Sequence, residues 1–341
     1  MNPEAPPRRV LVICVRYLGD TLLLRPCLRA LRAKWPEARI DAIVAKGTGC
    51  ALDGCPDVSR VIEWPQGVLA QAGALLALGA YDWAVDFTGN DRSALISLAS
   101  RARLRVAYER PKLPAWSLRR AAYHCRPPHK KSKPHTLLQR LELLEACGVP
   151  SRGTAFGLEP RASSLAACRD LVNGLPPRIL HVHVTSRDMQ KALPAELVRS
   201  VLAGAIDAGF GVVATSGRAE PERAHMTAAT SGLRPDSLRV FDSLDWQGLV
   251  AMISLCGAYW GCDTAPAHVA AALQKPMLIH YGPSRADHWS PLHAEGKADV
   301  LPCKCLRTRR VACPRGAPGK CLSGVRPADV LDWLRNVPTP Q

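Results

Sequence analysis

A carboxylate follows the first predicted strand of the chain. The apolar run from Val10 to Val15 predicts a strand buried on both faces, and Arg16-Tyr-Leu-Gly-Asp20 comes next, at the start of a predicted helix. In open α/β sheets ligands bind beyond the carboxyl ends of the strands, so Asp20 lies where chemistry is expected. Its carboxylate can serve as a general base. The alternative is a helix N-cap, a position that favours Asp.

Two hydroxyls and two cations follow a strand in the middle of the chain. That strand is predicted from Ile179 to Val184, and the polar residues are Thr185, Ser186, Arg187 and Lys191. Hydroxyls and cations at the carboxyl end of a strand suit a phosphate group. The alternative is a solvated loop that carries its Lys and Arg by chance.

The most specific motif is Gly261-Cys-Asp263-Thr264-Ala265-Pro-Ala-His268, which opens another predicted helix. Thr264 is placed to cap this helix and Pro266 suits its first turn. The free N–H groups of that turn favour an anion, and His268, one turn into the helix, can face the same site. The alternative is an ordinary capped helix with a structural histidine.

Two weaker candidates lie in the same half of the chain. Glu220 follows a strand predicted from Gly211 to Thr215 and can line the same cleft; the alternative is a surface carboxylate. Four cysteines stand close together near the end: Cys303, Cys305, Cys313 and Cys321. They could hold zinc, but the pattern is not the usual Cys-x2-Cys knuckle, so we favour reduced cysteines in a tight loop.

The 341 residues carry a net charge of +16, and this charge is concentrated in two segments. Residues 101–140 contain 12 Lys and Arg against one acid, and residues 303–326 contain seven against none, so the rest of the chain nets −2. Nucleic acid, an anionic membrane surface and a polyanionic substrate are the candidate partners, and a coding bias toward Arg is the alternative. Nucleic acid is disfavoured because no binding motif is present and aromatic residues make up only 5%.

These candidate residues are positioned by two series of alternating strands and helices. The alternation predicts parallel sheets with helices on both faces. We expect two doubly wound, Rossmann-like α/β domains facing across a cleft, at residues 1–160 and 175–325, with a closing helix and tail at 326–341. No G-x-G-x-x-G motif follows the first strand, which argues against a dinucleotide dehydrogenase. No segment predicts a bilayer span or a signal peptide, so we expect a cytoplasmic protein.

In their order along the chain, these motifs resemble those of the ADP-heptose:lipopolysaccharide heptosyltransferases, glycosyltransferase family 9. The sequence His183-Val-Thr-Ser-Arg187 is most similar to that of the heptosyltransferase III branch. The resemblance implies a GT-B fold and an inverting transfer of heptose from ADP-heptose to the inner core of lipopolysaccharide, without a tightly bound cofactor or metal. It assigns Asp20 as the base and Lys191 to the departing phosphates. The remaining donor contacts are Thr185, Ser186, Arg187, Glu220, Asp263, Thr264, Ala265 and His268.

The acceptor and the membrane account best for the basic segments. We expect Arg119, Arg120, Lys130 and Lys131 to contact the anionic acceptor, and the protein to work peripherally at the inner leaflet. One departure from the family is Leu193, where Trp is common; it removes an aromatic wall and puts the donor in question. The competing functions are a catalytically inactive scaffold that binds anionic lipid or lipopolysaccharide, and a glycosyltransferase that uses another nucleotide sugar.

Overall fold

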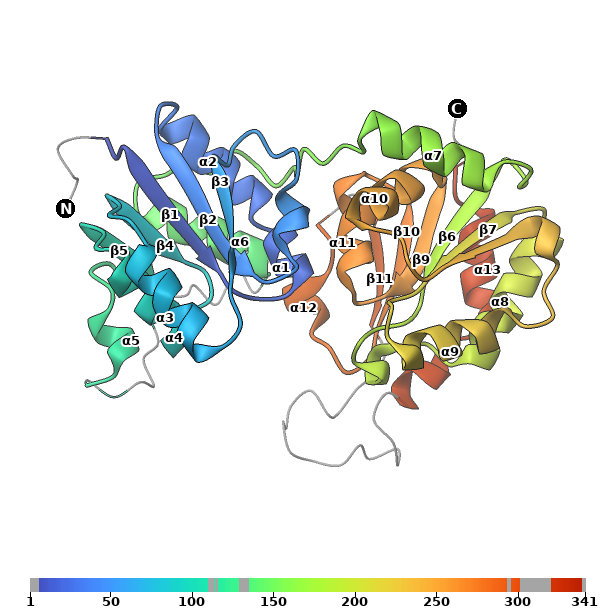
Figure 1. The fold of residues 1–341 in the computed structure, drawn as a ribbon. Coiled ribbons are helices and arrows are strands. Elements are labelled where there is room, and N and C mark those ends of the chain that lie inside the picture. The colour runs from blue at the N-terminus through green and yellow to red at the C-terminus, as the bar shows by residue number, and fades with distance from the viewer. Residues whose placement is uncertain are drawn as a thin grey trace. The chain divides into compact units, whose positions relative to one another are not determined.

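The computed structural model describes residues 6–109, 114, 116–128, 135–292, 296–300 and 320–338. The chain separates into two compact units, Met1–Gly157 and Leu158–Gln341. Each unit is built on its own parallel sheet (Figure 1).

The sheet of the first unit has the order β3-β2-β1-β4-β5. Its strands are β1 (Arg9–Cys14), β2 (Arg39–Ala45), β3 (Arg60–Trp64), β4 (Trp83–Asp86) and β5 (Leu104–Ala107). All neighbours are parallel, and β1 lies at the centre, where Val10 is in register with Ile40 and with Trp83. The predicted burial of this strand on both faces is confirmed, because Val10 to Cys14 are completely buried.

Helices cover both faces of this sheet. They are α1 (Leu18–Leu22), α2 (Arg25–Lys34), α3 (Val68–Ala77), α4 (Asp91–Ala99), α5 (Leu118–Ala121) and α6 (Thr136–Ala146), with a 3-10 turn at Gly49–Leu52. Residues of α3 and α4 pack on Leu11 and Ile13 of β1. The opposite face is covered by α2 and α6, which contact each other (Figure 1).

The second unit contains a six-stranded parallel sheet with the order β11-β10-β9-β6-β7-β8. Its strands are β6 (Ile179–His183), β7 (Gly211–Thr215), β8 (Leu238–Phe241), β9 (Ala258–Cys262), β10 (Met277–Tyr281) and β11 (Gly296–Val300). The central strands β6, β7, β9 and β10 are buried along their whole length. This burial matches their continuous apolar sequences, as expected for a parallel sheet covered on both faces.

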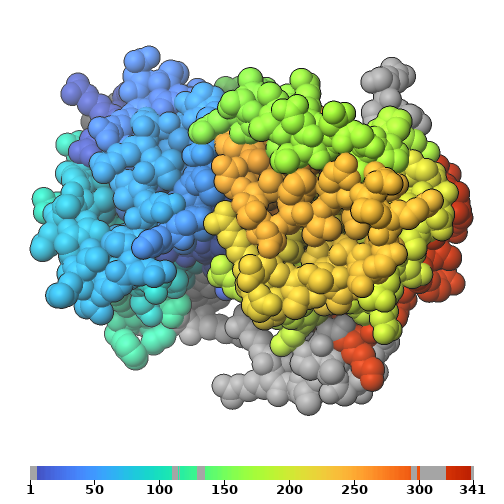
Figure 2. All heavy atoms as spheres, turned by 45° about the vertical axis from the view of Figure 1, so that its right-hand side comes forward, coloured from blue at the N-terminus to red at the C-terminus, as the bar shows by residue number. Residues whose placement is uncertain are grey.

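Helices also cover the second sheet. They are α7 (Ala162–Val172), α8 (Ala195–Asp207), α9 (Glu220–Thr230), α10 (Trp246–Leu255), α11 (Ala265–Ala272), α12 (Ala286–Trp289) and α13 (Pro327–Arg335), with 3-10 turns at Met189–Lys191, Pro235–Ser237 and Lys320–Gly324. The helix α7, which precedes the expected start of the second domain, packs against α10 (Figure 2). The last helix, α13, packs against α8. Both helices therefore belong to the second unit.

Two histidines of the central strand β6 are buried in the second unit. Burial lowers the pKa of His181 to about 3, with a further contribution from His183, and it lowers the pKa of His183 to about 4. The Nδ1 atom of His183 lies 2.9 Å from Oγ1 of Thr215, and the ring of His181 stacks on Tyr259. Both imidazoles are therefore neutral in the folded protein at pH 7.

This burial predicts that the protein loses stability as the pH falls. Below pH 6.5 the unfolded chain binds protons at both histidines and the folded protein does not, so the free energy of unfolding decreases from about pH 6.5 toward the folded pKa values. We expect the two histidines together to lower it by roughly 4 kcal/mol between pH 7 and pH 5. Urea denaturation at pH 7, 6 and 5 measures the effect. The His181→Gln variant should lose about half of this pH dependence, and an unchanged dependence in that variant would contradict the assignment.

No helix within the described ranges is long and apolar enough to cross a membrane.

Candidate functional site

Each sheet contains one topological switch point, where the strand order reverses. In the first unit this point lies between β1 and β4, and in the second unit between β6 and β9. Ligands of open α/β sheets bind beyond the carboxyl ends of the strands at such points. Asp20 follows β1, whereas Thr185 follows β6 and Asp263 follows β9. Each unit therefore presents predicted site residues at its own switch point.

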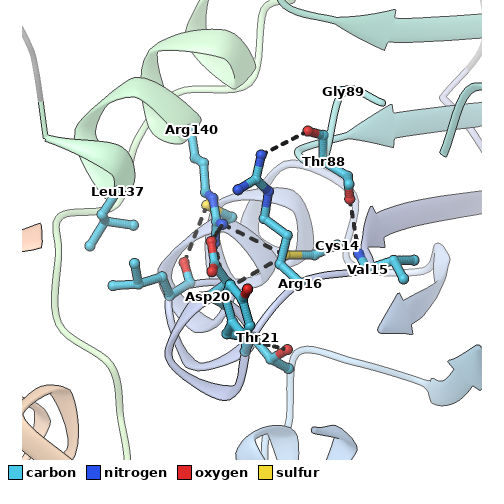
Figure 3. A network of polar contacts seen from close by, with 12 residues as sticks. Cys14, Val15, Arg16, Asp20, Thr21, Thr88, Gly89, Leu137 and Arg140 are labelled. Atoms are coloured by element: carbon cyan, nitrogen blue, oxygen red, sulfur yellow. Dashed lines mark hydrogen bonds and ion pairs between the residues drawn. The ribbon is translucent and has the colours of Figure 1, made fainter. Parts of the chain in front are cut away.

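In the first unit the carboxylate of Asp20 forms a buried ion pair with Arg140 of α6 (Figure 3). The guanidinium Nη2 lies 2.7 Å from Oδ1 of Asp20, and Nη1 donates to the Asp20 carbonyl oxygen at 2.6 Å. Both side chains are only 4% exposed. Burial would lower the pKa of Arg140, but the neighbouring Cys14 and Asp20 groups raise it above its usual value, so this cation remains charged.

The N-cap interpretation of Asp20 is wrong. The N-cap of α1 is Tyr17, which makes no side-chain cap hydrogen bond, and Asp20 lies inside the first turn of the helix. Its carboxylate is oriented toward Arg140 instead of the helix N-terminus (Figure 3). The ion pair with Arg140 fixes the orientation of the Asp20 carboxylate. A general base must likewise be held in a fixed orientation, whereas a cap must bind the N–H groups of the helix.

The neighbouring strand end completes this switch point. Thr88, just after β4, accepts a hydrogen bond from the Val15 backbone at its Oγ1, and its carbonyl oxygen accepts one from Arg16 at 3.1 Å (Figure 3). Asp86 accepts bonds from the N–H groups of Thr88 and Gly89, and burial raises the pKa of its carboxyl. These contacts hold the loops after β1 and β4 together around Asp20.

In the second unit, Lys191 and Asp263 meet across the switch point. The Lys191 Nζ atom lies 2.8 Å from Oδ2 of Asp263, and the two side chains are 28% and 9% exposed. Lys191 ends the 3-10 turn Met189–Lys191, which follows β6, and Asp263 follows β9 directly. The structure thus brings together two predicted residues that are 72 positions apart. An ammonium group held at this place can neutralise the phosphates of a ligand.

The hydroxyl residues after β6 differ in their surroundings. Thr185 is completely buried, and its Oγ1 has no hydrogen-bond partner among the described residues. Ser186 is half-buried, and its Oγ accepts the backbone N–H of Asp188 at 3.3 Å, whereas Arg187 is exposed. A buried hydroxyl without a hydrogen-bond partner destabilises the folded protein unless a ligand or water binds it. Among these three residues, Thr185 therefore gives the strongest indication of a ligand.

The helix α11 presents its N-terminus at this switch point. Thr264 is its N-cap residue and Pro266 lies in its first turn, as predicted. The expected side-chain cap is absent, because the Thr264 hydroxyl donates to the Cys262 carbonyl at 3.3 Å instead. The Ala267 N–H donates to the Thr264 carbonyl oxygen at 3.1 Å, and Pro266 has no N–H. The N–H of Ala265, at the start of the helix, can donate to an anion. His268 is buried one turn into the helix.

A glycine allows the strands at this point to approach closely. Gly261 of β9 is in register with His183 of β6, and a Cβ atom at Gly261 would lie 2.4 Å from the His183 carbonyl oxygen. Any side chain there would push apart β6 and β9, the two strands from which Thr185 and Asp263 follow. The glycine of the motif is therefore required by packing.

Glu220 and the nearby Glu222 differ in exposure, and Glu222 was not among the predicted site residues. Glu220 is 74% exposed and pairs with Arg223 at 2.6 Å, so the alternative of a surface carboxylate describes it. Glu222 is only 7% exposed and turns back under the loop after β7, where a Cβ atom at Gly217 would lie within 2.5 Å of its carboxylate. Both residues follow the same strand, and only the helical phase distinguishes them.

Leu193 is a core residue, so the prediction that it replaces an aromatic wall of the donor site is wrong. Its side chain is completely buried and packs in the core cluster of the second unit with Val198 and Leu202. Its backbone N–H donates to the carbonyl of Val184. A residue oriented into the core does not contact a ligand, and Leu in place of Trp changes the packing beneath the site.

The proposed acceptor residues are described only in part. Arg119 forms an ion pair with exposed Asp91 at 2.9 Å, and Arg120 lies 4.0 Å from Glu109. Lys130 and Lys131 lie outside the described residues.

Of the four late cysteines only Cys321 is described, and Cys303, Cys305 and Cys313 lie outside the described ranges. Cys321 is buried, and its Sγ would lie 2.8 Å from a Cβ atom at Gly282. Within the described part of the chain no three His, Cys, Asp or Glu residues are placed to hold a metal ion.

Comparisons with known proteins define the class. Lipopolysaccharide heptosyltransferase 3 of Escherichia coli is 23% identical over 290 residues, which cover 81% of this chain and 84% of the relative. Lipopolysaccharide heptosyltransferase 2 of Salmonella typhimurium is 25% identical over 358 residues, covering 96% and 98%. Because the two identities are so similar, they do not assign the chain to either the heptosyltransferase 2 or the heptosyltransferase 3 branch.

Solved structures show the same fold. A glycosyltransferase family 9 protein from Veillonella parvula superimposes with a TM-score of 0.79 at 17% identity, covering 97% of each chain. The E. coli heptosyltransferase WaaC with ADP gives 0.74 at 20% identity, covering 97% of this chain and 100% of the other. The chain therefore has the GT-B type α/β fold. The family model of glycosyltransferase family 9, the heptosyltransferase family, matches residues 71–317. The chain belongs to this family and is a glycosyltransferase.

Proposed function

We propose that this enzyme transfers heptose from ADP-heptose to the inner core of lipopolysaccharide, with inversion at the anomeric carbon. The observation that carries the proposal is the Lys191–Asp263 ion pair at the switch point, beside the N-terminus of α11 and the buried hydroxyl of Thr185. This combination suits a nucleotide diphosphate. The named activity of the relatives and the ADP in the WaaC structure support the same donor.

The second unit is the proposed donor side. Lys191 neutralises the charge that develops on the diphosphate as the anomeric carbon–oxygen bond breaks. Hydrogen bonds come from Thr185 and Ser186, with Arg187 as a further cation. The α11 N-terminus contributes the N–H group of Ala265. Asp263, Thr264 and His268 form the remaining donor cradle. We assign the nucleoside contact to Glu222, because Glu220 is turned to solvent.

The first unit is the proposed acceptor side. Asp20 removes the proton of the acceptor hydroxyl while the oxygen of that hydroxyl attacks the anomeric carbon, and ADP departs from the opposite side, which inverts the configuration. Arg140 contacts Oδ1, and Oδ2 makes none of the contacts found among the described residues, so Oδ2 is the proposed proton acceptor. Arg119 and Arg120 contact the phosphates or carboxylates of the acceptor core. The displacement invokes no resident cofactor.

The acceptor suggests the place of action. Lipopolysaccharide inner core is built on a lipid anchor, so we place the enzyme peripherally at the inner face of the cytoplasmic membrane. Nucleic acid has no role in this proposal.

We expect ADP to raise the melting temperature of the protein and UDP at the same concentration to raise it much less. A ligand that binds only the folded state stabilises it by about 2.7 kcal/mol at 100 times its Kd. In Glu222→Gln the shift with ADP should be reduced by at least half, because the variant loses a carboxylate acceptor for ribose hydroxyls. Differential scanning fluorimetry measures both effects.

Glu220→Gln is the matched control, since it removes an exposed carboxylate two residues away. Its shift with ADP should equal that of the wild type. Equal shifts with ADP and UDP would favour another nucleotide-sugar donor. No shift with either nucleotide would favour the inactive scaffold that binds lipid.

A further inference from the structure

The helix α3 is an unusual surface element because its outward face is apolar. Val68, Leu69 and Leu76 are 83%, 89% and 83% exposed, and no residue of the helix is fully buried. The segment from Pro65 to Tyr81 contains no charged residue. Soluble proteins rarely expose contiguous large apolar side chains, and such patches mark sites of interaction.

Two neighbouring helices extend this apolar surface. The helix α3 contacts α4, and α4 contacts α5, and Figure 1 shows the three on one side of the first unit. Leu95 of α4 is 46% exposed, and Trp116, just before α5, is 87% exposed. The Arg119–Asp91 ion pair links α5 to α4. We call the surface formed by α3, α4 and α5 the apolar face.

Exposed arginines lie in and after α4. Arg92, in the first turn of α4, and Arg101, two residues after the helix, are exposed, and the side chain of Arg103 is 89% exposed. The described residues between 91 and 128 contain seven Arg against the two acids Asp91 and Glu109. The described part of this segment, which includes α4 and α5, therefore carries a net charge of +5.

We propose that the apolar face docks this enzyme on an anionic lipid bilayer. Leu and Val side chains would enter the boundary between head groups and acyl chains, and an indole such as that of Trp116 is favoured at this depth. The exposed Arg92 and Arg101 would contact anionic head groups. A protein partner could also cover an apolar surface. The positive charge of the exposed arginines, however, matches the negative charge of a membrane leaflet. This inference rests on the proposed function in one respect, which is that the acceptor is anchored in such a leaflet.

The placement agrees with the proposed chemistry. The helices α3 and α4 follow β3 and β4, so they begin at the carboxyl edge of the sheet. Asp20, which follows β1, lies at the same edge. A bilayer that contacts the apolar face therefore contacts the same unit that carries the proposed base, Asp20. A lipid-anchored acceptor has to reach that base.

Flotation with vesicles of phosphatidylethanolamine and phosphatidylglycerol (3:1) tests the proposal. The wild type should float with these vesicles and much less with phosphatidylcholine vesicles. The double variant Leu69→Glu with Leu76→Glu should bind at least tenfold more weakly. Leu171→Glu is the matched control, because Leu171 is an exposed leucine (44%) on α7 of the second unit, and its binding should equal that of the wild type.

Activity assays separate this inference from the proposed function. The double variant should keep wild-type kcat and KM with a delipidated core oligosaccharide and lose at least tenfold in kcat/KM with acceptor embedded in vesicles. Equal vesicle binding by the wild type and the double variant would overturn the docking face. So would a wild-type dimer in sedimentation that the double variant converts to monomers, without vesicle binding by either. If the wild type floats but transfers heptose to no acceptor, the proposed function fails and the docking face stands.

Discussion

Asp20→Asn is expected to reduce heptosyl transfer by about 10³-fold in kcat, within the range for loss of a general base. The amide of Asn is similar in size to the carboxylate, but it cannot take the proton of the attacking hydroxyl. Binding of ADP should change little, because Asp20 lies at the switch point of the first unit and the proposed donor residues lie in the second. Initial rates and the thermal shift with ADP measure the two properties.

The same substitution has a structural cost that must be separated from the catalytic one. Arg140 is buried, and without the Asp20 carboxylate its guanidinium lacks a counter-charge. Removal of one partner from a buried ion pair costs about 3–5 kcal/mol, so Asp20→Asn is expected to unfold at a clearly lower urea concentration. Assays at low temperature keep the variant folded, and circular dichroism under assay conditions verifies it.

A double variant distinguishes the two effects. Replacing Arg140 by Met as well removes the uncompensated cation, and replacement of both partners of a buried pair is often nearly neutral. Asp20→Asn with Arg140→Met should therefore regain much of the stability and remain inactive. Near-normal turnover in Asp20→Asn, or recovery of activity together with stability in the double variant, would remove Asp20 from the mechanism.

Lys191→Met is expected to lower kcat by about 10²–10³-fold, comparable to the loss of one electrostatic group that stabilises developing charge. The charge on the departing diphosphate would no longer be neutralised, and Asp263 would face the phosphates without its cation. The KM for ADP-heptose should also rise. Steady-state kinetics with the donor varied measure both constants.

Lys191→Arg and Lys34→Met are the controls for this prediction. Arg keeps the positive charge and should retain more activity than Met. Lys34 is an exposed lysine at the end of α2, and its replacement by Met removes one charge far along the sequence from the proposed site residues. It should leave kcat unchanged. If Lys191→Met and Lys34→Met have the same small effect, Lys191 does not neutralise the leaving group.

Much of the fold was predictable because apolar runs and their turns are local signals. The buried strands near Val10, Ile179 and Met277 follow from continuous apolar sequence, and the end of α2 follows from Trp35-Pro36. Alternation of strands and helices then predicts parallel sheets, and parallel sheets bring strand ends together. Lys191 and Asp263 follow neighbouring strands of one sheet, and their common role at a donor site is what the family resemblance implies.

The remaining features depend on contacts that no local pattern contains. Arg140 lies 120 residues from Asp20, and no local pattern pairs the two residues. Glu220 and Glu222 differ in burial because they lie on different faces of α9. Which face each residue occupies depends on the residue at which the helix begins, and the sequence does not fix that residue. Leu193 was expected at a ligand wall because the resembled family commonly has Trp there, although its side chain is buried in the core. The exposure of the apolar helix α3 does not follow from its sequence, since an apolar sequence ordinarily indicates burial.

The most direct test of the central claim is transfer of heptose by the purified protein. ADP-heptose is incubated with a panel of core-truncated lipopolysaccharides, and each acceptor is examined by mass spectrometry while released ADP is measured in parallel. We predict the addition of one heptosyl residue to at least one acceptor, with an equal amount of ADP released and with both signals absent in Asp20→Asn. Absence of transfer to every acceptor by the folded wild type, or transfer that Asp20→Asn performs equally well, would contradict the account.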